Sequence, residues 1–210
     1  MSSFLTKTNR FLNHPDGAAP RSLVLVAVLA LLLTYFVPLW NLTMFAPQYP
    51  DGLTMDIYSY RLQGGNKNQD VKEINILNHY IGMRDLTDED FTEFKWMPFV
   101  IGALGLVSLR AAVYGSIGSL VDVTVLFTYF GLFSLWSFAY KLYVYGHNLA
   151  PTAAVKVPPF TPPVFGFKQI ANFQVYSYPQ AGTYAMAAVF VLLFAALFLA
   201  WRDFRRSAAA

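Results

Sequence analysis

The sequence contains no cysteine, which excludes disulfide bonds, thiolate metal sites and cysteine nucleophiles. Charge is also scarce: charged residues make up 13% of the 210 residues, whereas soluble domains carry about 25%. The formal net charge is only +3, and no long run of lysine or arginine occurs. Nucleic-acid-binding proteins normally present a strongly basic patch, so we expect no nucleic-acid partner.

Short catalytic motifs are missing as well. The chain has no G-x-S-x-G nucleophile turn, no H-E-x-x-H zinc motif and no glycine-rich phosphate loop. With only 3 histidines, it cannot form a histidine-rich metal cluster. We therefore expect a protein that is not an enzyme.

Apolar sequence is abundant. Hydrophobic residues make up 56% of the chain and aromatic residues 17%. Four stretches, residues 22–40, 97–114, 120–140 and 184–201, are close to the ~20 apolar residues that a helix needs to cross a bilayer. The first stretch ends at Trp40 without a small-residue cleavage site, so we interpret it as a retained span rather than a signal peptide. The sequence predicts an all-α integral membrane protein with four transmembrane helices.

The distribution of basic residues predicts how these helices are oriented. Short segments rich in lysine and arginine face the cytoplasm, and here they are residues 1–21 and 202–210. The short turn 115–119 falls on the same side, whereas the long segments 41–96 and 141–183 balance acidic against basic residues. We expect both termini in the cytoplasm and the two long segments outside it, packed together as a small irregular cap that lacks regular strands except for one short strand over Thr54–Leu62.

One charged pair is predicted near the cytoplasmic turn. Arg110 and Asp122 lie equally far in sequence from Ser116, so a helical hairpin would bring them to the same depth. Isolated charges are costly in a membrane, and pairing relieves part of that cost. We expect a structural ion pair, with a proton or ion path as the functional alternative.

The second long segment combines proline with aromatic residues. Proline stiffens an extended chain, and disordered segments are poor in aromatic residues, so this segment should lie against a surface. Aromatic side chains anchor protein interfaces, and the predicted partner-contact residues are Phe160, Phe165, Phe167, Phe173 and Tyr176. The alternative is that these rings pack on Ile74, Ile76 and Tyr80 of the first long segment.

Three residues could hold a soft metal or haem iron. His79 and Met83 are four positions apart, and His147 follows the third predicted span. Imidazole together with thioether favours copper or haem iron over zinc or magnesium. The alternative is that both histidines only make hydrogen bonds within the fold, and no cofactor is assigned from these residues alone.

Four strings resemble an uncharacterised family of small four-span bacterial membrane proteins. They are APQYPDGL (46–53), INILNHYIGM (74–83), YGHNLAP (145–151) and VPPFTPPVFGFKQIANFQVYSYP (157–179). Genes of that family accompany genes of periplasmic respiratory and copper enzymes, including those of nitrous oxide reduction. The resemblance implies a multi-pass protein of the bacterial inner membrane whose periplasmic face matters, and it supports His79, Met83 and His147 as positions to test.

Together these observations predict a non-catalytic membrane subunit or accessory factor. Its partner would be a larger membrane or periplasmic complex of the respiratory type, bound through the outer segments. The alternative is a copper or haem handling protein that uses His79, Met83 and His147.

Overall fold

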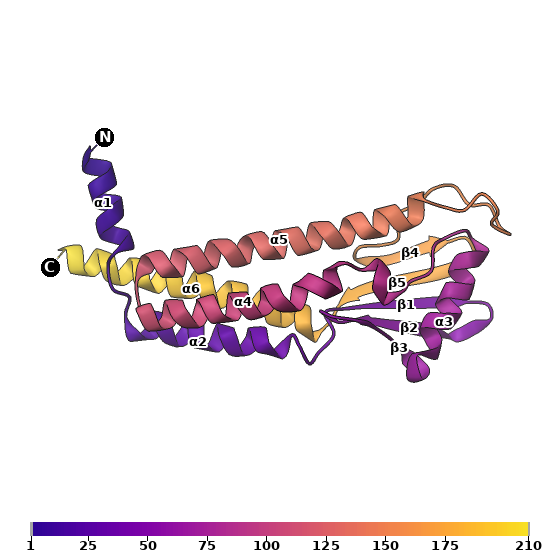
Figure 1. Ribbon diagram of the computed structural model, residues 1–210, viewed down its shortest axis with the longest axis horizontal. Coiled ribbons are helices and arrows are strands. Elements are labelled where there is room, and N and C mark those ends of the chain that lie inside the picture. The colour runs from indigo at the N-terminus through magenta and orange to yellow at the C-terminus, as the bar shows by residue number, and fades with distance from the viewer. Residues whose placement is uncertain (1, 210) are drawn as a thin grey trace. The chain divides into compact units, whose positions relative to one another are not determined.

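The computed structural model describes residues 2–209. Within them the chain forms helices, five strands and one short 3-10 turn (Figure 1). In chain order these are α1 (Ser2–Leu12), α2 (Ala18–Leu33), β1 (Trp40–Ala46), β2 (Tyr49–Ile57), β3 (Leu62–Gly64), α3 (Gly65–Tyr80), η1 (Asp88–Asp90), α4 (Glu93–Tyr114), α5 (Ile117–His147), β4 (Gly166–Ile170), β5 (Phe173–Pro179) and α6 (Ala181–Ala209).

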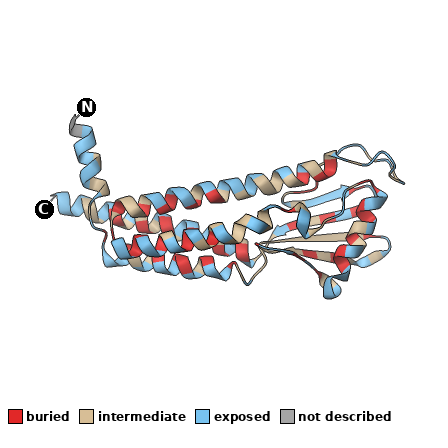
Figure 2. Ribbon diagram, viewed as in Figure 1, coloured by how far each residue is buried: buried red, intermediate tan, exposed pale blue. Residues whose placement is uncertain are grey.

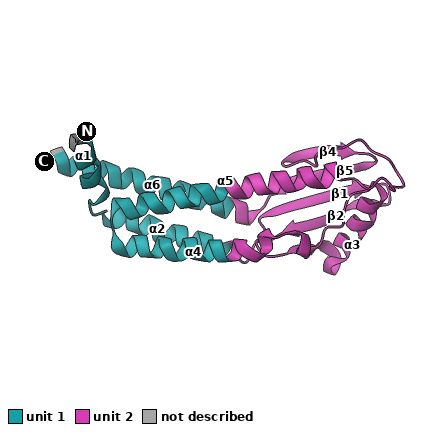
Figure 3. Ribbon diagram, turned by 45° about the horizontal axis from the view of Figure 1, so that its top comes forward, with its two compact units in different colours: residues 1–33, 99–132, 184–210 teal, residues 34–98, 133–183 magenta. Residues whose placement is uncertain are grey.

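The chain divides into two compact units (Figure 3). We call residues 1–33, 99–132 and 184–210 the helical unit, and residues 34–98 and 133–183 the sheet unit. Helices α4 and α5 contribute residues to both units.

The helical unit buries small side chains alongside large apolar ones such as Leu31 and Leu193, and it exposes other large apolar side chains. Ala27, Ala111 and Ala196 are at most 4% exposed, whereas Leu29 is 67% and Val113 82% exposed. Buried and exposed positions are interspersed along the helices α2, α4, α5 and α6 (Figure 2). Small residues allow membrane helices to approach closely, and lipid is as apolar as the large side chains that face it. Helices α4, α5 and α6 are long and apolar enough to cross a membrane.

The prediction of an all-α protein with four transmembrane helices is wrong. The chain contains a five-stranded antiparallel sheet, and only three of the helices formed by residues 2–209 meet the length and hydropathy of a membrane span. The predicted first span, 22–40, is helical only to Leu33, and α2 has 16 residues. At 1.5 Å per residue it is about 24 Å long, shorter than the ~30 Å hydrocarbon core.

The early end of α2 has a local cause. Pro38 disfavours a helical conformation at Val37, and the chain enters β1 at Trp40. The residues between are apolar, and hydropathy alone does not distinguish an apolar helix from an apolar extended chain. The predicted span therefore included residues that belong to the sheet unit.

The sheet unit joins the two long segments in one sheet of strand order β3-β2-β1-β5-β4, so the predicted irregular cap is a regular structure. Strand β1 is central, with Leu42 opposite Met55 of β2 on one side and opposite Ser177 of β5 on the other. The predicted single strand over Thr54–Leu62 covers parts of β2 and β3.

The core of the sheet unit lies on one face of this sheet. Met55 and Val175 of the strands pack in one buried cluster with Ile74 of α3, and with Phe91 and Tyr145. Alternation along a strand sends successive side chains to opposite faces. The opposite face of the sheet is therefore free of this core.

The entry into α3 is an unusual left-handed turn. Asn66, Lys67 and Asn68 have φ values of 50°, 57° and 71°. The buried carboxylate of Asp70 accepts hydrogen bonds from the Asn66 side chain (2.8 Å) and from the Thr54 backbone N–H (2.9 Å). Asparagine tolerates this region better than most residues, and Asp70 holds the turn against β2.

The predicted partners Arg110 and Asp122 are both exposed. The Arg110 guanidinium lies over the ring of Tyr114, 5.6 Å from its centroid, and the four ion pairs found among residues 2–209 do not join it to Asp122. The helical unit instead pairs the buried Asp16 carboxylate with the partly exposed Arg21, at 2.8 Å between Oδ1 and Nε.

Both ends of the chain meet at one end of the helical unit. The ring of Phe11 packs on that of Phe204 of α6 at 5.1 Å, and Asp16 N–H donates to the Gly115 carbonyl at 3.0 Å. The segment before α2, the α4–α5 turn and the last turns of α6 therefore lie together.

Candidate functional site

The outer face of the sheet carries a cluster of exposed aromatic rings. Phe167 of β4 is opposite Tyr176 of β5, so both project to the same face. Their ring centroids are 5.0 Å apart, Phe45 of β1 packs edge-on against Tyr176 at 5.6 Å, and Phe165 against Tyr178 at 5.5 Å. We call these five residues, Phe45, Phe165, Phe167, Tyr176 and Tyr178, the aromatic face.

Much of the aromatic face is open to its surroundings. Phe165 is 68% exposed, Phe167 51% and Tyr178 43%. The rings contact each other at distances typical of favourable aromatic pairs. They therefore form two groups of contacting rings, Phe45 with Tyr176 and Phe167, and Phe165 with Tyr178, rather than isolated exposed side chains.

A glycine fixes the position of one of these rings. Gly52 of β2 has φ +84°, and a Cβ built there would lie 2.7 Å from the Phe45 ring. The Phe45 side chain thus lies across a position that only glycine leaves free. Any other residue would have to displace the ring and accept a strained backbone.

The predicted partner-contact residues separate into two groups. Phe165, Phe167 and Tyr176 belong to the aromatic face. Phe173 is 5% exposed within the core, and Phe160 packs against the same core. The alternative prediction, packing on the first long segment, describes Phe173, which shares the buried cluster with Ile74.

Sequence reasoning missed Phe45 and Tyr178. The signal for Tyr178 was present, because in Phe173–Tyr178 strict alternation places Tyr176 and Tyr178 on one face and Phe173 on the other. Phe45 carried no comparable signal, since its strand joins β5 only through tertiary pairing.

His79 and Met83 line one open surface pocket, which we call the His79 pocket. Its volume is about 520 Å³, and its other lining residues are Gly82, Arg84, Asp85, Asp90, Asn148, Leu149 and Ala150. Arg84 and Asp90 form an ion pair at 3.0 Å across it. The spacing of His79 and Met83 at the end of α3 therefore does bring the two side chains to a common site.

His147 is not among the residues that line this pocket. Its ring stacks on Tyr143 with a centroid separation of 3.8 Å, and its Nδ1 lies 2.9 Å from the Tyr143 carbonyl oxygen. Among residues 2–209 no group of three or more His, Asp or Glu side chains is placed to hold a metal ion. The structure thus brings two of the three predicted ligands together.

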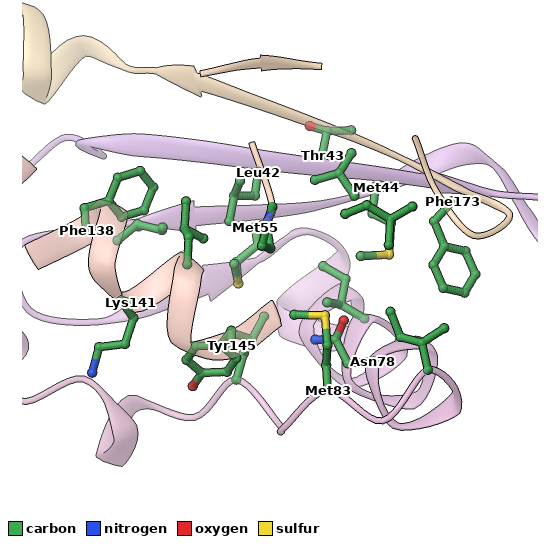
Figure 4. A pocket seen from close by; sticks show the side chains of 18 of the residues that line it. Leu42, Thr43, Met44, Met55, Asn78, Met83, Phe138, Lys141, Tyr145 and Phe173 are labelled. Atoms are coloured by element: carbon green, nitrogen blue, oxygen red, sulfur yellow. The ribbon is translucent and has the colours of Figure 1, made fainter. Parts of the chain in front are cut away.

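A second pocket, which we call the methionine pocket, lies inside the sheet unit (Figure 4). Its volume is about 70 Å³, and three methionines from separate segments line it: Met44 of β1, Met55 of β2 and Met83. Asn78, at the end of α3, lines it too and is 1% exposed.

A coupled pair of titratable groups fastens α3 to β2. The Tyr49 hydroxyl donates a hydrogen bond to the Glu73 carboxylate. This bond is the main reason that the pKa of Tyr49 is raised and the pKa of Glu73 is lowered. Gln69 adds a second hydrogen bond to Glu73 at 2.9 Å, so the pair acts in stability rather than in chemistry.

No known family model matches this chain, and no curated protein matches it. The candidate sites of the molecule are the aromatic face, the His79 pocket and the methionine pocket.

Proposed function

We propose that this protein is a non-catalytic membrane subunit or accessory factor that binds a larger protein complex through the aromatic face. The observation that carries the proposal is the exposure of Phe165 and Phe167, each of which packs on another ring of the aromatic face. Contiguous apolar patches on a folded surface mark interaction sites. Aromatic residues also supply much of the binding energy in protein interfaces.

The resemblance to bacterial membrane proteins supports the choice of partner. Two of its strings, 46–53 and 157–179, contribute to the sheet, and the second contains four of the five rings of the aromatic face. The proposed partner is a periplasm-facing complex of the respiratory type, concerned with electron transfer or a copper enzyme.

The proposed location is the bacterial inner membrane, with both termini in the cytoplasm. Both ends of the chain lie at the same end of the helical unit, and basic residues accumulate in the terminal segments, including Arg10, Arg21, Arg202 and Arg206. Reporter fusions after the last residue and within 66–69 should report opposite sides of the membrane. Two reporters on one side would contradict this topology.

Partner binding is tested by changing the rings without disturbing the core. The variant Phe165→Ser/Phe167→Ser should insert normally and lose a larger complex that co-purifies with the wild type in mild detergent, as identified by mass spectrometry. The matched control is Ile76→Ser/Tyr80→Ser, which removes two equally exposed apolar side chains from α3. Loss of the complex in the control but not in the aromatic variant would overturn the proposal.

A second candidate function is copper or haem handling with His79, Met83 and His147 as ligands. The observation in its favour is that His79 and Met83 line the same pocket. Titration of the purified protein with Cu(I) against a chelator, and with haem followed by absorbance, tests it. Stoichiometric binding that is lost in His79→Ala/Met83→Ala supports this function, and absence of stoichiometric binding by the wild type excludes it.

A further inference from the structure

We infer that the methionine pocket binds a small neutral apolar molecule that carries one hydrogen-bond-accepting oxygen, such as a carbonyl or ether oxygen. This inference is independent of partner binding, because the pocket lies on the core side of the sheet and the aromatic face on the other.

The lining of the pocket selects an apolar molecule. Leu42, Ile57 and Val175 of the strands and Phe138 and Leu142 of α5 enclose it, together with the three methionines. A single water molecule needs roughly 10–15 Å³ of cavity volume. The methionine pocket has a cavity volume of about 70 Å³, so it accommodates several heavy atoms. Methionine side chains are flexible and adapt to the shape of a bound molecule.

Asn78 supplies the polar recognition element. Its side chain is 1% exposed, and its Nδ2 has no hydrogen-bond partner among residues 2–209. Buried side-chain donors are paired in the large majority of cases. The backbone carbonyl oxygen of Asn78 accepts a hydrogen bond from the Met83 backbone N–H at 2.8 Å, which fixes the turn that places both residues at the pocket. A donor held in an apolar pocket calls for a ligand with an acceptor.

The charges around the pocket favour a neutral ligand. Lys141 is the only charged residue among those that line it, and its Nζ donates to the Asp90 carbonyl at 2.8 Å and lies 3.6 Å from the Glu93 carboxylate. Its charge is thus already compensated and does not call for an anion. Three thioethers are soft ligands suited to Cu(I), but the Asn78 side-chain N–H groups would face such a cation unfavourably.

Met83 provides the route to this pocket. Of the residues that line the methionine pocket and the His79 pocket, it alone lines both. The open pocket is therefore separated from the buried one by a flexible side chain, and rotation of Met83 would admit the ligand from the surface.

The test uses the full chain in detergent with 13C-labelled methionine methyl groups. The probes are cyclobutanone and methylenecyclobutane, which have nearly the same shape and differ in the acceptor oxygen. We expect cyclobutanone to shift the methyl signals of Met44, Met55 and Met83, and to leave those of Met97 and Met186, which do not line the pocket, unchanged.

The variant Asn78→Leu keeps the size of the side chain and removes the donor. It should weaken cyclobutanone binding about tenfold, which corresponds to one net hydrogen bond, and leave methylenecyclobutane binding equal or stronger. Each probe is compared between the wild type and the variant in the same detergent, so its partition into the detergent is the same for both proteins. If the variant does not fold, the comparison of the two probes on the wild type still decides whether an acceptor is recognised.

Several outcomes would overturn the inference. One is the absence of methionine shifts with both probes, and another is equal binding of the two probes by the wild type. A third is stoichiometric Cu(I) binding that shifts the same three methyl signals, which would make the pocket a metal site. A fourth is an ordered water on Asn78 Nδ2 that persists at saturating cyclobutanone, which would make it a hydration site.

Discussion

The two units of the molecule both expose large apolar side chains, but they differ in how those side chains are arranged. The helical unit buries small residues such as Ala196 beside large ones such as Leu193, and it exposes leucine and valine along its helices. The sheet unit buries Met55 and Ile74, and the outer face of its sheet exposes aromatic rings. The first pattern suits helices that face lipid, whereas an apolar patch on a folded surface is typical of an interaction site. Exposure of an apolar residue therefore has a different meaning in each unit.

The largest expected effect comes from the buried residues of the sheet unit. Met55→Ala should lower the free energy of unfolding by about 2–5 kcal/mol, because it removes a fully buried side chain and leaves a cavity. Phe167→Ala, on the exposed face of the same sheet, should change it by no more than about 0.5 kcal/mol. Thermal unfolding in detergent, followed by near-ultraviolet circular dichroism, measures both. Similar losses for the two variants would show that the aromatic face is part of the core.

In the helical unit the second prediction compares a large substitution at a buried alanine with the same substitution at an exposed position. Ala196→Phe should destabilise the protein by about 1–3 kcal/mol, because a large ring is forced into a closely packed position where Ala196 is 0% exposed. Val191 of the same helix is 64% exposed, so Val191→Phe should be nearly neutral. Unfolding in increasing fractions of a denaturing detergent compares the two. Equal tolerance of both changes would contradict the close helix packing in this unit.

The smallest expected effect is on the pH dependence of the stability of the sheet unit, through the hydrogen bond between Tyr49 and Glu73. The pKa of Glu73 is lowered from its ordinary value of 4.5, so its contribution to stability is present above that value and is lost as pH falls through the lowered pKa. The pKa of Tyr49 is raised above 10.0, so its contribution is present at neutral pH and lost only in strong alkali. Glu73→Gln should therefore flatten the fall of the melting temperature between about pH 5 and pH 3.

The matched control for this pH profile is Asp51→Asn, which changes an exposed acid of the same unit. It should leave the slope as in the wild type. Parallel curves for wild type and Glu73→Gln would contradict the role assigned to the Tyr49–Glu73 hydrogen bond.

The sequence identifies the helices better than the sheet. The apolar runs that became α4, α5 and α6 are long enough to be recognised by hydropathy alone. The end of α2 was missed because the apolar residues before Trp40 continue without a polar signal. Most of the sheet was missed because its central pairing joins Thr43 to Tyr176, and no local pattern reports such a distant contact.

The candidate sites show the same limit. The four-residue spacing of His79 and Met83 predicted a shared site because it is local to the end of α3. The methionine pocket could not be predicted, since Met44, Met55 and Asn78 meet only through the packing of β1 and β2 on α3.

The pairing of β1 with β5 also sets an order of events during biosynthesis. The paired residues Thr43 and Tyr176 are about 130 residues apart in sequence. Because translation adds roughly 5–20 residues per second, β5 is synthesised at least several seconds after β1. Helices α4 and α5 are made in that interval, so β1 stays with one unpaired edge while the membrane part assembles. An unpaired edge is open to pairing with other chains. Slowed translation between α5 and β4 should therefore increase aggregation of the newly made protein, although the finished fold would be unchanged.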